Sequence, residues 1–229
     1  MLIELIFIVG PAIVALLMAL ASAGSAVLFA AACGFAGTML FLRSPAVRRW
    51  HVAQRAQSGL LGPLAERGFL PLIAVILCYS CAFGLTEIGI TAYASETGSP
   101  AMAGVLLALM SVGSAVGGLA YGSRGWHVPL ARQFFNMLAL MGAGLVILTL
   151  RWSPLTFALL CVIAGIVMAP ALIIQSMLVA KLARAEHSTE AFTWSTSALL
   201  AGIGLGLAAG GAVLDWLDWR APVGAAALV

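Results

Sequence analysis

Long uncharged runs dominate the chain, and short charged connections separate them. A helix that crosses about 30 Å of hydrocarbon at 1.5 Å per residue needs about 20 mostly apolar residues. Five later runs have or approach this length, and each predicts one crossing: 68–86, 97–123, 133–150, 152–180 and 191–214. Residues 5–42 lack charge over 38 positions, which is too long for one helix. The small residues at 21–25 divide this run, so we expect two helices there, over 2–20 and 25–43.

The last nine residues, 221–229, are apolar again and begin an eighth helix. The pattern therefore predicts an all-α, polytopic transmembrane helix bundle with seven complete helices and a partial eighth. The first helix has an alternative interpretation as a signal peptide, because Ala21-Ser22-Ala23 resembles a cleavage site after an apolar segment. Against this, the leading residues carry Glu4 and no basic residue, and the chain becomes apolar again at once. A membrane helix is the favoured interpretation.

The composition agrees with a membrane protein. Apolar residues make up 63% of the chain and charged residues 8%, against roughly a quarter charged in an ordinary soluble domain, which excludes a soluble globular enzyme. The net charge of +3 does not indicate nucleic-acid binding, because the basic residues lie between apolar runs rather than on one face. Cys78 and Cys81 have the spacing of a metal or redox pair, but no second pair or nearby histidine completes four ligands. Packing is the favoured role of these cysteines, and we expect no metal or cofactor.

Basic residues gather in alternate connections. The connections 43–67, 121–132 and 181–190 hold nine of them, and the remaining two are Arg151 and Arg220. The positive-inside rule places the first set, including loops 44–67, 121–132 and 181–190, in the cytoplasm. The basic loop 44–67 divides the chain into a two-helix part, 1–43, and a larger part, 68–229. We interpret this loop mainly as an orientation signal that contacts lipid headgroups, with binding of a protein partner as the alternative.

One acidic residue follows an otherwise uncharged predicted helix. Tyr79, Phe83 and Glu87 are spaced at i, i+4 and i+8, which places them on one helix stripe. An acid in a membrane helix is costly and is usually functional or paired. The stripe could line a cavity, where the aromatic rings contact an organic substrate and the carboxyl group exchanges a proton. Alternatively, Glu87 lies near the outer surface and is hydrogen-bonded to a threonine or to a neighbouring helix end.

Two later helices carry further polar candidates. Gln175 follows Pro170 in the run 152–180, where a proline tends to kink a helix; the amide marks either a cavity or an interhelical hydrogen bond. Glu190 and Trp194 lie at the start of the next helix. Glu190 could be a site residue or simply an acid in a first helical turn, and Trp194 an interface anchor or a packing residue.

Glycines recur at four-residue spacing inside the apolar runs. They are Gly113 and Gly117 in one helix, and Gly202, Gly206 and Gly210 in another. In lipid, small residues at this spacing let helix backbones approach closely. We therefore expect a tightly packed bundle.

Three segments resemble motifs of the major facilitator superfamily, in particular its bacterial drug or sugar efflux branch. Gly117, Leu119, Ala120 and Arg124 are similar to the gate-loop motif, with Tyr121 where the family has aspartate. Gly10-Pro11 resembles the antiporter motif, and Gly211, Asp215 and Arg220 resemble the pattern between the last two helices. The resemblance identifies 2–43 with the family's fifth and sixth helices, 44–67 with its central loop and 68–229 with its second half. It implies that four earlier helices and part of the last are missing.

The resemblance implies a secondary transporter in the bacterial inner membrane, in which proton exchange drives efflux of a drug, metabolite or sugar. Tyr79, Phe83, Glu87, Gln175, Glu190 and Trp194 would line the substrate and proton pathway. We expect the partners to be a small-molecule substrate, protons and the lipid bilayer, and the full-length protein to be a monomer. The alternative is a non-transporting membrane fragment or interaction module. Motifs of soluble and membrane enzymes are absent from the sequence, so we do not expect an enzyme.

Overall fold

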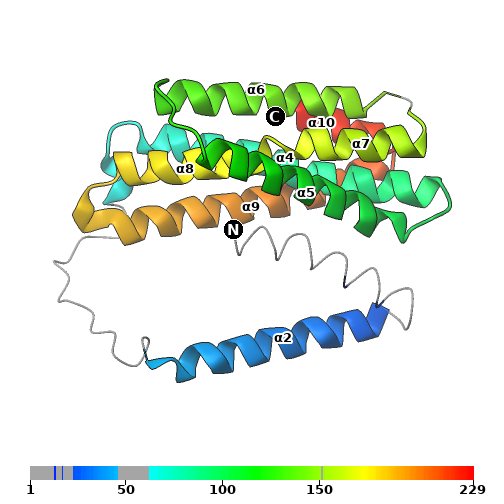
Figure 1. The fold of residues 1–229 in the computed structure, drawn as a ribbon, viewed down its shortest axis with the longest axis horizontal. Coiled ribbons are helices and arrows are strands. Elements are labelled where there is room, and N and C mark those ends of the chain that lie inside the picture. Colours follow the sequence, from blue (N-terminus) through cyan, green and yellow to red (C-terminus); the bar gives the residue numbers. More distant parts are fainter. Residues whose placement is uncertain (1–12, 14–16, 18–22, 46–61, 151) are drawn as a thin grey trace.

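The computed structural model describes residues 13, 17, 23–45, 62–150 and 152–229, and within these ranges the fold is helical with no strand. The helices are α2 (Ala23–Arg43), α4 (Phe69–Glu96), α5 (Met102–Gly122), α6 (Leu130–Leu148), α7 (Pro154–Gly165), α8 (Met168–Leu182), α9 (Ser188–Leu214) and α10 (Arg220–Leu228). Two short 3-10 turns, Pro63–Ala65 and Ala185–His187, precede α4 and α9. Helices α4 to α10 lie together in one bundle, and α2 lies apart from it (Figure 1).

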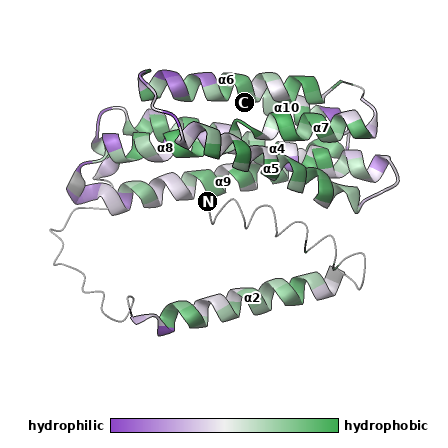
Figure 2. Ribbon diagram, in the orientation of Figure 1, coloured by the Kyte–Doolittle hydropathy of each residue, from purple (hydrophilic) through white to green (hydrophobic). Residues whose placement is uncertain are grey.

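Six helical spans in the described ranges are long and apolar enough to cross a membrane, with α7 and α8 counted as one span. They confirm six of the expected helices and are compatible with a multi-pass membrane protein. The expected helix 2–20 lies outside the described residues except at two positions, and so does most of the basic loop 44–67. The expected start of an eighth helix is present as α10. Hydrophilic residues gather towards the ends of the bundle and apolar ones along its helices (Figure 2).

Helix α4 ends ten residues beyond the uncharged run that predicted it. We expected a helix over 68–86 that Glu87 would end, but α4 continues to Glu96. A single glutamate does not end a helix, because glutamate has a high helix propensity. Its side chain needs only to lie away from the buried contacts between helices, and Glu87 is exposed. The helix ends where Gly98 adopts φ +74°, and the Ser99 amide donates to the Ala94 carbonyl at 3.1 Å.

The helix expected over 152–180 is broken into α7 and α8. The break lies at Ile166 and Val167, before Pro170 rather than at it. Pro170 is the third residue of α8, where an amide hydrogen would have no partner inside the helix, so the proline fits without removing a bond. The expected kink therefore becomes a break, displaced by one turn towards α7.

Glycines provide the closest helix contacts. A Cβ atom added at Gly206 of α9 would overlap the carbonyl oxygen of Cys81 on α4, and one added at Gly84 of α4 would overlap the carbonyl oxygen of Ile203 on α9. Helices α5 and α7 meet in the same way at Gly113, whose added Cβ would overlap the Val162 carbonyl oxygen. The predicted role of the glycine repeats is confirmed.

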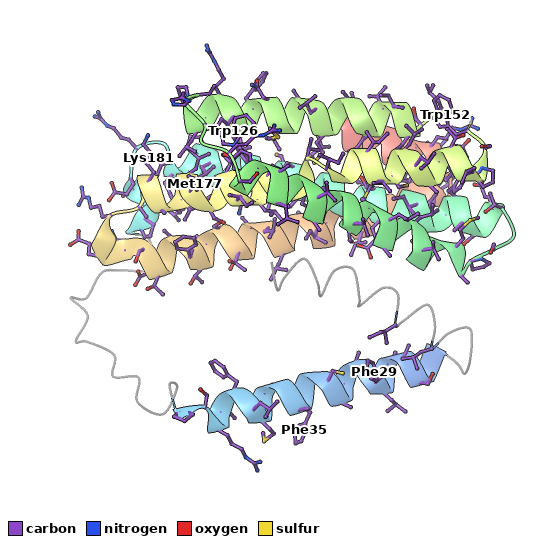
Figure 3. All side chains as sticks on the ribbon, in the orientation of Figure 1. Phe29, Phe35, Trp126, Trp152, Met177 and Lys181 are labelled. Carbon is purple, nitrogen blue, oxygen red and sulfur yellow. The ribbon has the colours of Figure 1, made fainter. Side chains whose placement is uncertain are left out.

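Helix α2 contributes little to the bundle. Among its described side chains only Ala26 is buried. Phe29 and Phe35 project from α2 with 44% and 69% of their surface exposed (Figure 3). Trp126 and Trp152 lie at opposite ends of the bundle in the same view, as the aromatic residues at the two interfaces of a membrane protein do.

Candidate functional site

A buried polar network joins three of the membrane-length helices. The Tyr79 hydroxyl of α4 donates a hydrogen bond to the Gln175 side-chain oxygen of α8. The Gln175 Nε2 group donates to Ser195 Oγ of α9 at 2.8 Å. The three residues are 2%, 5% and 4% exposed. The structure thus brings together two of the predicted site residues and adds Ser195, which was not among them.

The network has local reasons to form at this place. Gln175 lies two turns into α8, after the break, and its planar amide offers an acceptor and a donor on opposite edges. Tyr79 lies in the first half of α4, and Ser195 lies two turns into α9. In a membrane, polar side chains without water are costly unless they bond to one another. The three groups are hydrogen-bonded to one another, and the Gln175 amide keeps one further donor hydrogen and one further acceptor lone pair.

Two aromatic rings surround Tyr79. Phe83 meets the Tyr79 ring edge-on with the centroids 5.4 Å apart, and Phe134 of α6 does so at 5.8 Å. Edge-to-face pairs of this kind favour one ring orientation. Because the ring is fixed on two sides, its hydroxyl stays directed at Gln175. Phe134 is a second contributor that the sequence did not single out.

Glu87 does not belong to this network. The stripe predicted on α4 exists, but it runs from buried Tyr79 through half-buried Phe83 to exposed Glu87. The two threonines that could have bonded the carboxyl group bond to the backbone instead: Thr86 donates to the Ala82 carbonyl at 2.7 Å and Thr91 to the Glu87 carbonyl at 2.8 Å. Within the described ranges, no side chain pairs with the Glu87 carboxyl group. Its charge therefore lies on the surface of a membrane-length helix.

Glu190 and Trp194 lie in the first two turns of α9, both half-buried. The expected helix start is confirmed, because α9 begins at Ser188 and Glu190 is the acid of its first turn. Trp194 packs against the core next to Ser195 in the chain. Both residues therefore lie on α9, the helix that carries Ser195 of the network, and Glu190 lies at its N-terminal end.

The segment that resembles the gate motif forms a corner held by uncharged groups. The Tyr121 hydroxyl donates to the Gln133 side-chain oxygen, and the Tyr121 ring stacks on Trp126 with the centroids 5.1 Å apart. Trp126 Nε1 donates to the Tyr121 carbonyl at 3.0 Å. Gly117 is the point of closest approach to Ile166 at the α7–α8 break. Tyr121 thus joins the ends of α5 and α6 without an ion pair.

The other residues of the gate-like segment lie on the surface of the bundle. Leu119, Ala120 and Arg124 are exposed, and Arg124 has no acidic partner in the described part of the chain. Gln133 and Trp126 complete the corner, and neither was among the predicted site residues. The antiporter-like Gly10 and Pro11 lie outside the described residues.

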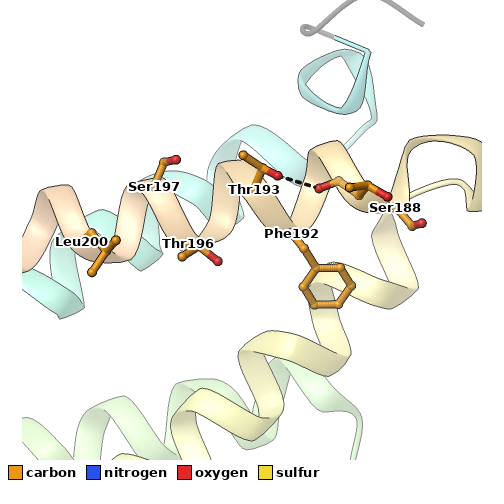
Figure 4. A pocket seen from close by; sticks show the side chains of 7 residues that line it. Ser188, Phe192, Thr193, Thr196, Ser197 and Leu200 are labelled. Carbon is orange, nitrogen blue, oxygen red and sulfur yellow. Dashed lines mark hydrogen bonds between the residues drawn. The ribbon is translucent and has the colours of Figure 1, made fainter. Parts of the chain in front are cut away.

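The exposed face of α9 carries a second polar feature. A shallow groove of about 530 Å³ runs along it, and its lining includes the hydroxyl groups of Ser188, Thr189, Thr193, Thr196 and Ser197. Figure 4 shows the lining side chains along the first half of α9, where Thr193 donates to the Thr189 carbonyl at 2.9 Å. Phe192 and Leu200 complete the lining. The groove is open and lies on a single helix, so it is a contact surface rather than an enclosed site.

Comparisons of the chain with protein families, with curated proteins and with solved structures find no match. Its four cysteines are free, and in the described ranges no group of three or more His, Cys, Asp or Glu side chains could hold a metal ion. Within the described ranges, the Tyr79–Gln175–Ser195 network is a buried polar feature shared by three helices.

Proposed function

We propose that this chain is a secondary transporter of small molecules, related to the major facilitator superfamily and placed in a bacterial inner membrane. The observation that carries the proposal is the Tyr79–Gln175–Ser195 network. Polar residues buried within membrane helices are costly and commonly mark substrate or ion pathways. The network also differs from a hydrogen bond between two helices, because movement of α4, α8 or α9 away from the others breaks at least one of its bonds.

The broken span supports the same proposal. Secondary transporters typically form their sites at discontinuous helices, and one part of the bundle rocks against the other around that site. Here the break at Ile166 and Val167 directly precedes the helix that carries Gln175. Gly117 of the gate-like segment contacts this break. A change in the α5–α6 corner can therefore act on the position of Gln175.

In the proposed mechanism, Glu87 exchanges the coupling proton. Its side chain is exposed and unpaired within the described ranges, and it lies about 12 Å along α4 from Tyr79 at 1.5 Å per residue. A carboxylate in hydrocarbon is costly, whereas a protonated carboxyl group is far less so. Proton uptake would therefore accompany any movement that brings Glu87 into lipid, and proton release any movement that brings it to water. Efflux is the direction that the resemblance implies.

Transport in proteoliposomes tests the proposal. The chain and a full-length form that carries the helices implied by the resemblance are each reconstituted, a proton gradient is imposed, and the movement of a small panel of cationic and neutral dyes is followed. We expect gradient-driven transport by the full-length form, its loss in Glu87→Gln and in Gln175→Leu, and its retention in Gly204→Ala, which changes an open surface position of α9. Comparable membrane insertion of all variants is the control. Coupled transport that survives Glu87→Gln would contradict the assigned role of the carboxyl group.

The hydroxyl-lined groove of α9 favours a second candidate function, a membrane interaction module that does not transport. Five hydroxyl side chains on the open face of a membrane-length helix suit contact with another polar helix surface. This candidate predicts a stably inserted chain that moves none of the dyes and co-purifies with another membrane protein. Substitution of Thr193 and Ser197 by leucine would then release that protein, whereas the transporter proposal predicts no such loss.

A further inference from the structure

The connection between α5 and α6 carries positive charge that no acid in the surrounding sequence balances. No aspartate or glutamate occurs in residues 97–185, whereas five basic residues do: Arg124, Arg132, Arg151, Lys181 and Arg184. Arg124 follows the end of α5 and Arg132 lies in the first turn of α6, and both side chains are exposed. Within the described ranges neither arginine forms an ion pair. The counter-charge for this connection therefore comes from outside the stretch 97–185.

Lys181 adds a third charge at the same end of the bundle. Gly113 of α5 contacts Val162 of α7, and Gly117 contacts Ile166 one turn further along both, so the two spans run in the same direction. Lys181, in the last turn of α8, therefore lies at the end of the bundle where α5 ends, as Figure 3 shows. It is exposed and forms no ion pair in the described part of the chain. We call the three residues the basic corner: Arg124, Arg132 and Lys181.

Arg184, at the same end, differs because acids neutralise it. Its Nε atom lies 2.8 Å from Glu66 Oε1, and its Nη1 atom lies 3.8 Å from Glu186 Oε1. Glu66 belongs to the segment before α4, and Glu186 to the connection between α8 and α9. This end of the bundle thus holds one arginine with two acidic partners and, in the basic corner, three cations with none among the described residues. The basic corner is therefore free to attract an external anion, and Arg184 provides an internal comparison.

Trp126 indicates how deep in a membrane the basic corner lies. Its ring stacks on Tyr121, and its Nε1 group donates to the Tyr121 carbonyl at 3.0 Å, so the protein satisfies the polar edge of the indole. The side chain is nevertheless 43% exposed. Tryptophan gathers at headgroup level in membrane proteins. Because α5 and α6 are both long enough to cross the hydrocarbon layer, their connection lies at its boundary, where lipid phosphates are found.

We propose that the basic corner binds the headgroup phosphate of an anionic membrane phospholipid. Arginine N–H groups bind phosphate oxygens in pairs, and basic residues next to a membrane helix attract anionic lipids. The acyl chains of such a lipid would lie against exposed apolar residues of the adjoining helices, including Leu119 of α5 and Phe135 of α6, which are 51% and 70% exposed. A soluble anion would gain nothing from these residues, so charge and apolar surface together favour a lipid. The inference depends on insertion into a membrane and not on transport.

Native mass spectrometry of the purified full chain tests the proposal. The chain in detergent micelles is titrated with phosphatidylglycerol, or with phosphatidylcholine of the same acyl chains, whose cationic choline cancels the phosphate charge. We expect tighter binding of phosphatidylglycerol. Arg124→Gln and Arg132→Gln should each weaken this binding about fivefold, the factor that one basic residue contributes near an anionic surface, and leave phosphatidylcholine binding unchanged. Arg124→Lys, which keeps the charge, should retain most of the preference.

Arg184→Gln is the matched control. It removes the same type of side chain at the same end of the bundle, but from a position that is already paired with Glu66 and Glu186. We expect it to leave phosphatidylglycerol binding unchanged. A thermal transition measured by circular dichroism verifies that each variant is folded. The two corner substitutions are made separately, so that either folded variant suffices.

Three results would overturn the proposal. One is equal affinity of the unmodified chain for the two lipids, or a preference that survives both corner substitutions. Another is a loss of phosphatidylglycerol binding in Arg184→Gln as large as in the corner variants, because charge at this end would then act regardless of its position. The third is displacement of phosphatidylglycerol by inorganic phosphate beyond that caused by sodium chloride of the same ionic strength, because the basic corner would then take a soluble anion.

Discussion

The contact between α4 and α9 gives a prediction whose size can be worked from the backbone. An added Cβ at Gly206 would overlap the Cys81 carbonyl oxygen and lie 3.0 Å from both the Cys81 carbonyl carbon and the Leu85 amide nitrogen. These are backbone atoms in the middle of a helix, so they cannot rotate away as the end of a side chain would. Gly206→Ala must therefore push the two helices apart. Overpacking of this kind costs about 1–3 kcal/mol.

A second glycine on the same helix provides the matched control. Gly204 has no atom within 4 Å of an added Cβ, and it is exposed. Gly204→Ala creates no overlap and gains up to about 1 kcal/mol of helix propensity. The two variants have the same composition, length and net charge. We therefore expect them to change the free energy of unfolding in opposite directions.

Reversible unfolding in mixed detergent micelles, followed by circular dichroism, measures the difference. We expect the transition of Gly206→Ala at a lower fraction of denaturing detergent than that of the unmodified chain, and the transition of Gly204→Ala at an equal or higher fraction. If both variants are equally stable, α4 and α9 do not meet through this glycine face. The arrangement of the bundle around that pair would then be wrong.

Three further predictions address the network, the corner and the topology. Tyr79→Phe should lower the free energy of unfolding by about 0.6 kcal/mol, with about 1.7 kcal/mol as an upper value, because it removes one interhelical hydrogen bond. Gln175→Leu should lower it by about twice as much, because it removes two. If the effects of the two substitutions add in the double variant, the two side chains are not bonded to each other. Tyr121→Phe should keep the stacking on Trp126 but loosen the corner, seen as greater accessibility of Trp126 to an aqueous fluorescence quencher, and unchanged quenching would refute the role of the hydroxyl group. A cysteine introduced at Gln57, in a variant without native cysteines, should react with a membrane-impermeant maleimide only after the cytoplasmic side is opened; labelling of intact cells would refute the orientation.

The helices were predictable from the sequence because one physical constraint decides them. A span of about 20 apolar residues has few alternatives to a helix, since every backbone polar group must be satisfied within lipid. The glycine repeats were predictable for a related reason, as their spacing matches one helix face. Gly206 and Gly113 both lie where the backbones of two helices touch. Periodicity along one helix was sufficient in each case.

The members of the polar network were only partly predictable, because they depend on how each helix is rotated against its neighbours. Ser195 lies in the run Thr193-Trp194-Ser195-Thr196-Ser197, and its sequence context does not distinguish it from the other hydroxyl residues. In the structure Ser195 is buried and bonded to Gln175, whereas Thr196 and Ser197 face the open groove. Likewise, the sequence left two placements for Glu87, on a cavity-lining stripe or near the outer surface, and the rotation of α4 leaves its side chain exposed. The packing of the helices, rather than the residue type, decides which of these side chains are buried in the network and which are exposed.

The distribution of close contacts indicates which part of the bundle can move. Helices α4 and α9 touch backbone to backbone at Gly84 and Gly206, so neither can slide along the other without steric overlap. Helix α8 is attached to that pair through the side chain of Gln175, and hydrogen bonds of this kind exchange at little cost when another polar group replaces them. The break before Met168 removes the helical continuity that would otherwise tie α8 to α7. A ligand that replaces Tyr79 or Ser195 as a partner of Gln175 would therefore displace α8 and leave the α4–α9 pair unchanged. Site-directed spin labels on α4, α8 and α9 test this: a substrate that shifts the α4–α9 distance as much as the α4–α8 distance would refute it.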